Sequence, residues 1–148
     1  MSELISIAAD HGGYELKEQI KKHLEERGIE YVDHGTNSTE SVNYPEYAHP
    51  VCVDVQEGKA RLGILVCGTG IGMSMAANKH KGIRAACCSE DYSARLTRMH
   101  NDANVLCIGG RVIGAGVALD IVDAFLDTKF EGGRHCKRIE MFMKLENE

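Results

Sequence analysis

The chain has 148 residues, of which 43% are hydrophobic and 26% are charged, and its formal net charge is −5 at pH 7. This length suits a single domain spanning residues 1–148, and the acidic balance argues against nonspecific nucleic-acid binding. No apolar run approaches twenty residues and no secretory signal pattern is present, so we expect a cytoplasmic protein without a membrane partner. The six cysteines lack C-x-x-C spacing, which disfavours a structural zinc site.

Short apolar runs alternate along the chain with segments of helical periodicity. Residues 4–9 predict a strand, and the four-residue recurrence of Leu16, Ile20 and Leu24 predicts a helix that ends at Gly28. Further strands are predicted over residues 29–32, 62–66, 83–88 and 105–108, and further helices over residues 44–56, 71–80, 91–100, 117–126 and 134–145. Because strands that alternate with helices pair in parallel, we expect an α/β fold with a doubly wound, five-stranded parallel sheet and helices on both faces.

The most informative segment is residues 63–73, where an apolar strand pattern ends in Cys67 and continues as a glycine-rich loop, residues 68–72. A strand that leads through glycines into a helix presents free backbone N–H groups, which stabilise an anion. A thiol beside these donors can serve as a base or a nucleophile, and the alternative is a small buried core residue. Met73 stands where a thiol phosphatase needs arginine, and neither a P-loop nor a complete dinucleotide fingerprint is present.

Two other predicted strand ends carry glycines together with charged or titratable groups, at residues 10–13 and 109–111. Farther along, Arg134 and Arg138 are spaced to share one helical face and grip a phosphate, although such a pair can also be an ordinary solvated face. The parallel sheet brings the strand-end loops together, and with the arginines they predict a site where a phosphorylated substrate loses and regains a proton. The segment 100–102 ends the fourth predicted helix at the opposite edge of the sheet, so we expect it to act across a dimer interface.

Four segments carry a resemblance to a known family: residues 9–13 (ADHGG), 67–73 (CGTGIGM), 98–106 (RMHNDANVL) and 109–114 (GGRVIG). Together they closely resemble ribose-5-phosphate isomerase type B, whose family also contains allose-6-phosphate and galactose-6-phosphate isomerases. The resemblance covers nearly the whole chain. It implies a Rossmann-like three-layer sandwich and a homodimer with active sites shared between subunits, and it leaves open whether dimers pair into tetramers.

The resemblance further implies an aldose–ketose isomerisation that uses neither a metal nor a redox cofactor. Cys67 resembles the base that moves a proton between C1 and C2 of the open-chain sugar through a cis-enediolate, and His100 resembles a residue that assists ring opening from the neighbouring subunit. The implied catalytic residues are Cys67, His100, Thr69 and Asp10. The implied substrate-binding residues are His11, Tyr44, Gly68, Gly70, Ile71, Gly72, Asn101, Arg111, Arg134 and Arg138, with His11 and the three arginines as the phosphate-binding set.

Three functional hypotheses follow from these residues. The sequence favours an isomerase that interconverts ribose 5-phosphate and ribulose 5-phosphate. An isomerase of a six-carbon sugar phosphate, allose 6-phosphate or galactose 6-phosphate, is the first alternative, because preference for chain length depends on the packing near Tyr44 and Asn101. A noncatalytic phosphosugar-binding module is the second alternative, because every group except the thiol would serve binding equally well.

Overall fold

The structure, a computed structural model, describes residues 3–148 of the chain. The strands in this range are β1 (Ile5–Ala9), β2 (Tyr31–Asp33), β3 (Leu62–Cys67), β4 (Ala85–Cys87) and β5 (Val105–Gly109). The helices are α1 (Tyr14–Glu26), α2 (Tyr44–Gln56), α3 (Ile71–Ala77), α4 (Asp91–Asn101), α5 (Ala115–Asp127) and α6 (Arg134–Met143), which the 3₁₀ helix η1 (Lys144–Asn147) extends.

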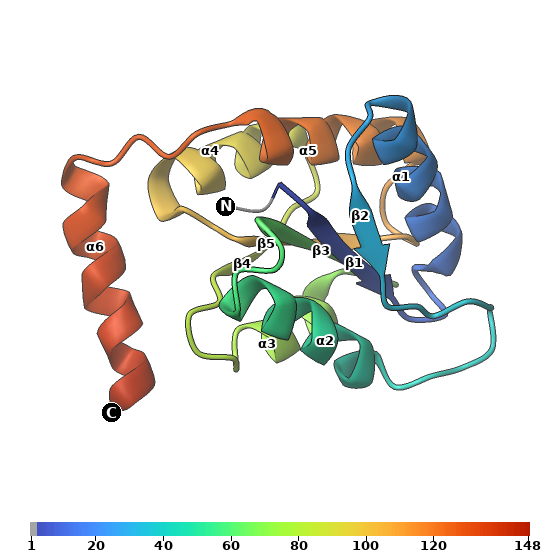
Figure 1. Cartoon of the computed structure of the whole chain (residues 1–148), viewed down its shortest axis with the longest axis horizontal. Coiled ribbons are helices and arrows are strands. Elements are labelled where there is room, and N and C mark those ends of the chain that lie inside the picture. The colour runs from blue at the N-terminus through green and yellow to red at the C-terminus, as the bar shows by residue number, and fades with distance from the viewer. Residues whose placement is uncertain (1–2) are drawn as a thin grey trace.

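The five strands form one sheet in the order β2-β1-β3-β5-β4, and every neighbouring pair is parallel. Helices α1, α4 and α5 cover one face of this sheet, whereas α2 and α3 cover the other (Figure 1). The predicted α/β fold with a doubly wound parallel sheet is therefore confirmed. Because β1, β3 and β5 occupy the centre, the loops that follow them meet at one edge, where ligands bind in sheets of this type.

Alternate residues of the central strands point into two separate cores. Ile64 and Val66 pack under the layer of α1, α4 and α5, whereas Leu65 and Cys67 pack under α2 and α3. Burial on both faces explains why the strands read as continuous apolar runs in the sequence. The Cys67 side chain therefore points toward the face of the sheet that α2 and α3 cover.

The ends of several elements differ from the prediction, and at two of them a polar side chain bonds the backbone where the element stops. Helix α3 ends at Ala77, and the amide of Asn78, the next residue, bonds to both backbone groups of Ala85 at 2.8 and 3.0 Å. Strand β4 is three residues long, shorter than the predicted 83–88, and the N–H of Arg84 donates to Oδ1 of Asn104 at 2.7 Å. Polar side chains therefore set these boundaries, and the apolar pattern does not show them.

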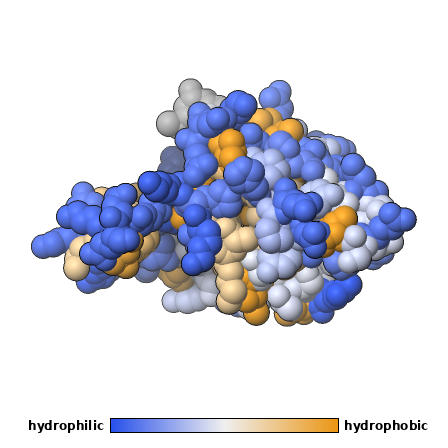
Figure 2. Space-filling view, turned by 90° about the horizontal axis from the view of Figure 1, so that it is seen from below, coloured by the Kyte–Doolittle hydropathy of each residue, from blue (hydrophilic) through white to orange (hydrophobic). Residues whose placement is uncertain are grey.

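Helix α6 covers neither face of the sheet. It projects from the body beside α4, at the left of Figure 1, and the space-filling view shows the same projection with apolar side chains among the hydrophilic ones (Figure 2). Met141, Phe142 and Leu145 are exposed on this C-terminal segment. Within residues 3–148, no helix has the length and apolar character needed to cross a membrane.

Candidate active site

The loop after β1 is held by the carboxylate of Asp10, which is buried. Its Oδ1 accepts hydrogen bonds from the N–H groups of Gly12 at 2.9 Å and Gly13 at 3.2 Å. A Cβ on Gly13 would lie 2.4 Å from the carbonyl oxygen of Val66, so only glycine lets α1 begin this close to β3. Asp10 therefore fixes the turn that brings His11 to the end of the sheet.

The loop after β3 wraps around Cys67, a residue that is 5% exposed. The N–H of Gly70 donates to Sγ of Cys67 at 3.1 Å, and the N–H of Ile71 donates to Oγ1 of Thr69 at 3.2 Å. Helix α3 has only seven residues, so the loop amides supply the local positive potential at the thiol more than a helix dipole does. The loop therefore holds the sulfur in a fixed position, where cysteine can take a proton or attack carbon once it is ionised.

The loop after β5 is bonded to the loop after β3. The N–H of Gly110 donates to the carbonyl of Cys67 at 2.8 Å, and the N–H of Arg111 donates to the carbonyl of Gly68 at 3.0 Å. A Cβ on Gly109 would lie 2.7 Å from the backbone of Thr69, and one on Gly110 would lie 2.8 Å from the carbonyl oxygen of Gly12. Glycine thus allows the three loops to touch backbone to backbone and form one rigid surface.

A cavity of about 230 Å³ opens between the loops after β1 and β5. His11 and Arg111 line it together with Gly12, Glu15, Leu16, Thr39 and Gly110. Nδ1 of His11 accepts a hydrogen bond from the N–H of Val42 at 3.2 Å, so the neutral ring carries its proton on Nε2 and can donate it to an anion. A guanidinium and an imidazole donor in one hollow suit a phosphate group.

Tyr44 opens α2 beside the glycine loop. A Cβ on Gly72 would lie 2.9 Å from Cζ of Tyr44, which shows how closely the ring covers the backbone at that point. Tyr44 is exposed, and its helix lies on the side of the sheet toward which Cys67 points. The structure therefore groups Asp10, His11, Tyr44, Cys67, Gly68, Thr69, Gly70, Ile71, Gly72 and Arg111 at the carboxyl ends of the strands.

The other candidate residues lie elsewhere within the chain. Arg134 and Arg138 are exposed on α6, which Figure 1 shows at the opposite side of the molecule from the start of α1. His100 and Asn101 end α4, whose C-terminal end lies beside α6. The structure therefore does not bring the predicted phosphate-binding arginines of α6 to His11 and Arg111 of the same chain.

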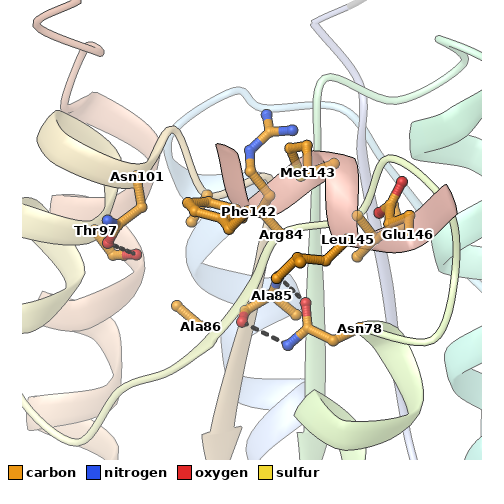
Figure 3. A pocket seen from close by; sticks show the side chains of 12 residues that line it. Asn78, Arg84, Ala85, Ala86, Thr97, Asn101, Phe142, Met143, Leu145 and Glu146 are labelled. Atoms are coloured by element: carbon orange, nitrogen blue, oxygen red, sulfur yellow. Dashed lines mark hydrogen bonds between the residues drawn. The ribbon is translucent and has the colours of Figure 1, made fainter. Parts of the chain in front are cut away.

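Asn101 faces a second cavity, of about 610 Å³, between the C-terminal segment and the edge of the sheet (Figure 3). Its Oδ1 accepts a hydrogen bond from Oγ1 of Thr97 at 3.0 Å. Phe142 and Leu145 supply apolar walls, and Arg84 and Glu146 supply charges. Within one chain, Asn101 is thus separated from the strand-end loops.

His100 belongs to a cluster that sequence reasoning missed. Its ring stacks on that of His135, with centroids 4.3 Å apart and planes 14° from parallel, and its Nε2 lies 3.3 Å from Oε2 of Glu131. Burial, and then the positive charges of His100 and Arg134, lower the pKa of His135. The only sequence signal for this cluster was that His135 follows Arg134. The linker that carries Glu131 has no periodic pattern from which the position of Glu131 could be predicted.

The chain is similar over most of its length to known proteins. A family model described as Ribose/Galactose Isomerase matches residues 5–142. Ribose-5-phosphate isomerase B of Escherichia coli (strain K12) is 52% identical over 142 residues, which cover 96% of this chain and 95% of that protein.

Solved structures give the same result. Ribose-5-phosphate isomerase B of Clostridium thermocellum matches with a TM-score of 0.96 and 49% identity, covering 97% of both chains. The Mycoplasma genitalium ribose-5-phosphate isomerase B with bound ribulose-5-phosphate matches with a TM-score of 0.95 and 43% identity, covering 100% of this chain and 99% of that chain. The resemblance indicated by the four sequence segments is confirmed.

Proposed function

The chain belongs to the Ribose/Galactose Isomerase family, and on that premise we propose that it is a single-domain aldose–ketose isomerase that interconverts ribose 5-phosphate and ribulose 5-phosphate. The observation that carries the proposal is the Cys67 thiol, which accepts a backbone N–H at the point where the loops after β1, β3 and β5 meet. A noncatalytic phosphosugar-binding module would need the cavity between the loops after β1 and β5, but it would not need a catalytic base. The reaction belongs to the pentose phosphate pathway.

The chemistry requires one base and a group that stabilises negative charge on oxygen. The Cys67 thiolate takes the proton from C2 of the open-chain aldose, and the electron pair of that C–H bond forms the cis-enediolate as the carbonyl oxygen at C1 becomes negative. Return of the proton to C1, with transfer of the hydroxyl proton from O2 to O1, leaves the ketone. Such proton transfer by a positioned side chain contributes about 10²–10⁴-fold to a rate.

Thr69 and the glycine loop are suited to the oxygen atoms of the sugar. Oγ1 of Thr69 accepts the N–H of Ile71, so its own O–H is directed away from that bond and can donate to O1 or O2. The N–H groups of residues 68–72 that are not bonded to Cys67 or Thr69 stabilise the enediolate oxygen, as preorganised donors do at a developing oxyanion. Asp10 contacts the hydroxyl groups of the sugar, and Tyr44 and Ile71 contact the carbon chain of the sugar.

The active protein is a cytoplasmic homodimer in this proposal, with His100, Asn101, Arg134 and Arg138 reaching the loops of the partner subunit. Two features support it. Helix α6, which carries Arg134 and Arg138, lies across the molecule from the loop between β1 and α1 that contains His11 (Figure 1). Exposed apolar side chains occur both at the site, on Ile71 and Val112, and on the projecting C-terminal segment, so each surface offers the other a partner.

Turnover of ribose 5-phosphate by the purified protein and by Cys67→Ala tests this function. We expect the parent to be active and the variant to lose about 10²–10⁴-fold in kcat/KM, because the loop remains but the base is gone. Cys52→Ala is the matched control: Cys52 is buried on the same side of the sheet, and burial raises its pKa to about 12, so it supplies no thiolate. It should fold and retain turnover.

Three results would contradict the proposal in different ways. Activity retained in Cys67→Ala would move the base to another residue. A higher kcat/KM for allose 6-phosphate than for ribose 5-phosphate would move the substrate to the six-carbon class. A folded parent that binds these sugar phosphates without turning any of them over would identify a binding module.

A further inference from the structure

A second group of titratable side chains lies apart from the strand-end loops, where α4 ends and α6 begins. It consists of His100, Glu131 and His135, which come from the last turn of α4, the linker and the first turn of α6. The linker is bonded to α4, because the N–H of Glu131 donates to the carbonyl of Met99 at 3.1 Å. The N–H of His135 donates to the carbonyl of Gly132 at 3.2 Å, which starts the helix at a fixed place.

The contacts of His100 fix the plane of its ring and the direction in which its Nε2 points. The face lies on the His135 ring at a centroid distance of 4.3 Å, and the edge carrying Nε2 lies 3.3 Å from Oε2 of Glu131. His135 is 5% exposed, and its buried Nε2 has no hydrogen-bond partner within the described residues. Burial and neighbouring positive charge lower its pKa, so at neutral pH it offers His100 an uncharged ring face.

The three residues resemble a metal-ligand set by proximity, since one ligand atom of each lies within 4.8 Å of the others. The ring planes decide against chelation in this arrangement. Imidazole lone pairs lie in the plane of the ring, and two rings stacked 14° from parallel cannot direct their lone pairs at one cation. The geometry suits the orientation of one histidine by two neighbours.

We propose that Glu131 and His135 are positioning residues for His100 in the opening of the sugar ring, an inference that rests on the proposed isomerase function. The carboxylate favours a proton on Nε2, because an N–H facing it is attracted and a lone pair is repelled. Nδ1 is then the nitrogen that exchanges a proton with the sugar. Opening breaks the C1–O4 bond, forms the C1 carbonyl and moves a proton from O1 to O4, and the stacked His135 ring holds the imidazole plane during that transfer.

Two assays separate ring opening from isomerisation. Conversion of ribose 5-phosphate, which is mostly a closed furanose, requires both steps. Exchange of solvent deuterium into C1 of ribulose 5-phosphate requires only proton transfer by Cys67, because the phosphate on O5 prevents this ketose from closing a ring. A residue that acts through His100 should affect the first assay and spare the second, whereas a folding defect lowers both.

The variants are Glu131→Gln, His135→Ala and His135→Phe, with His100→Asn as the reference. We expect Glu131→Gln and His135→Ala to lower kcat for ribose 5-phosphate by about tenfold or more and to change the exchange rate by less than about twofold. His135→Phe keeps a flat ring under His100 and should recover most of the loss. Glu140→Gln, an exposed carboxylate on the same helix, should match the parent in both assays.

The outcomes distinguish the positioning roles of Glu131 and His135 from the isomerase function on which they rest. If His100→Asn shows the split and the Glu131 and His135 variants match the parent, the positioning roles are wrong and the isomerase assignment stands. If these variants lower both rates equally, their role is in folding or phosphate binding, and the inference is overturned. If the parent converts neither sugar phosphate, the proposed function fails and takes this inference with it.

Discussion

Gly70 determines the shape of the loop after Cys67. Its φ is +82°, and an added Cβ would lie 2.9 Å from the carbonyl carbon of Ile108 and 3.0 Å from Sγ of Cys87. Gly68, two residues earlier in the same loop, has room for a methyl group, whose nearest contact would be Cδ of Arg111 at 3.5 Å. The two glycines therefore differ in what they contribute, although the sequence shows them as equivalent members of one motif.

Gly70→Ala should lower the free energy of unfolding by at least about 1–2 kcal/mol, the cost of the left-handed conformation for a residue with a Cβ. Turnover should fall as well, because the N–H that donates to Cys67 moves. Gly68→Ala should leave the fold intact and serve as the matched control. Urea unfolding and ribose 5-phosphate turnover measure both effects, and equal stabilities of the two variants would show that the turn does not require Gly70.

At the level of secondary-structure elements, a buried ion pair ties α1 to the end of β2. The ammonium of Lys17 is fully buried and lies 2.7 Å from Oδ2 of Asp33, which Lys21 also approaches at 2.8 Å. Burial alone would raise the pKa of Asp33, but hydrogen bonds from Lys17 and Lys21 prevail and hold it below its ordinary value. A carboxyl with a depressed pKa stabilises the fold at pH values above the pKa that it has in the unfolded chain, about 3.9. This contribution is lost as the pH falls through the lower pKa of the folded state.

Asp33→Asn should therefore destabilise the protein at neutral pH and flatten the loss of stability in acid. Breaking a buried ion pair costs about 3–5 kcal/mol, and we expect the lower end because Glu18 still contacts Lys17 at 3.0 Å. Urea unfolding at neutral pH and at about pH 3 measures the difference. Asp120→Asn, an exposed carboxylate on α5, is the control, and a parent-like pH dependence in Asp33→Asn would contradict the assignment.

The helices and strands could be predicted where burial produces a regular pattern of apolar residues in the sequence. Strands β1, β3 and β5 are buried on both faces and read as apolar runs, and the glycines at their ends marked the loops of the site. The order in which β4 and β5 lie in the sheet depends on packing between distant segments, which no local pattern encodes. Glu131 and His135 were missed for the same reason, because their roles depend on the spatial position of a linker.

At the scale of the whole molecule, α6 is the element whose place in the protein a single chain does not explain. The sequence predicts a helix over residues 134–145 but contains no signal for what its apolar side chains contact. In the structure Phe142 and Leu145 face a cavity at the edge of the sheet and pack on neither of its faces, and the arginines of α6 are separated from the other candidate phosphate ligands (Figure 1). The dimer that we propose would account for both features at once, because the arginines would then reach the partner's loops.

The most direct test of a site assembled from two chains is complementation between Cys67→Ala and Arg138→Ala. Each variant alone should be nearly inactive on ribose 5-phosphate while remaining folded. In a mixed dimer, one site would combine the intact Cys67 of one protomer with the intact Arg138 of the other. Co-expression followed by purification through two different tags isolates this species.

We predict that the purified mixed dimer regains about half of the parent's turnover, because one of its two sites is native. If the mixed dimer is folded and remains as inactive as the variants, the residues of α6 serve the loops of their own chain and the shared site is wrong.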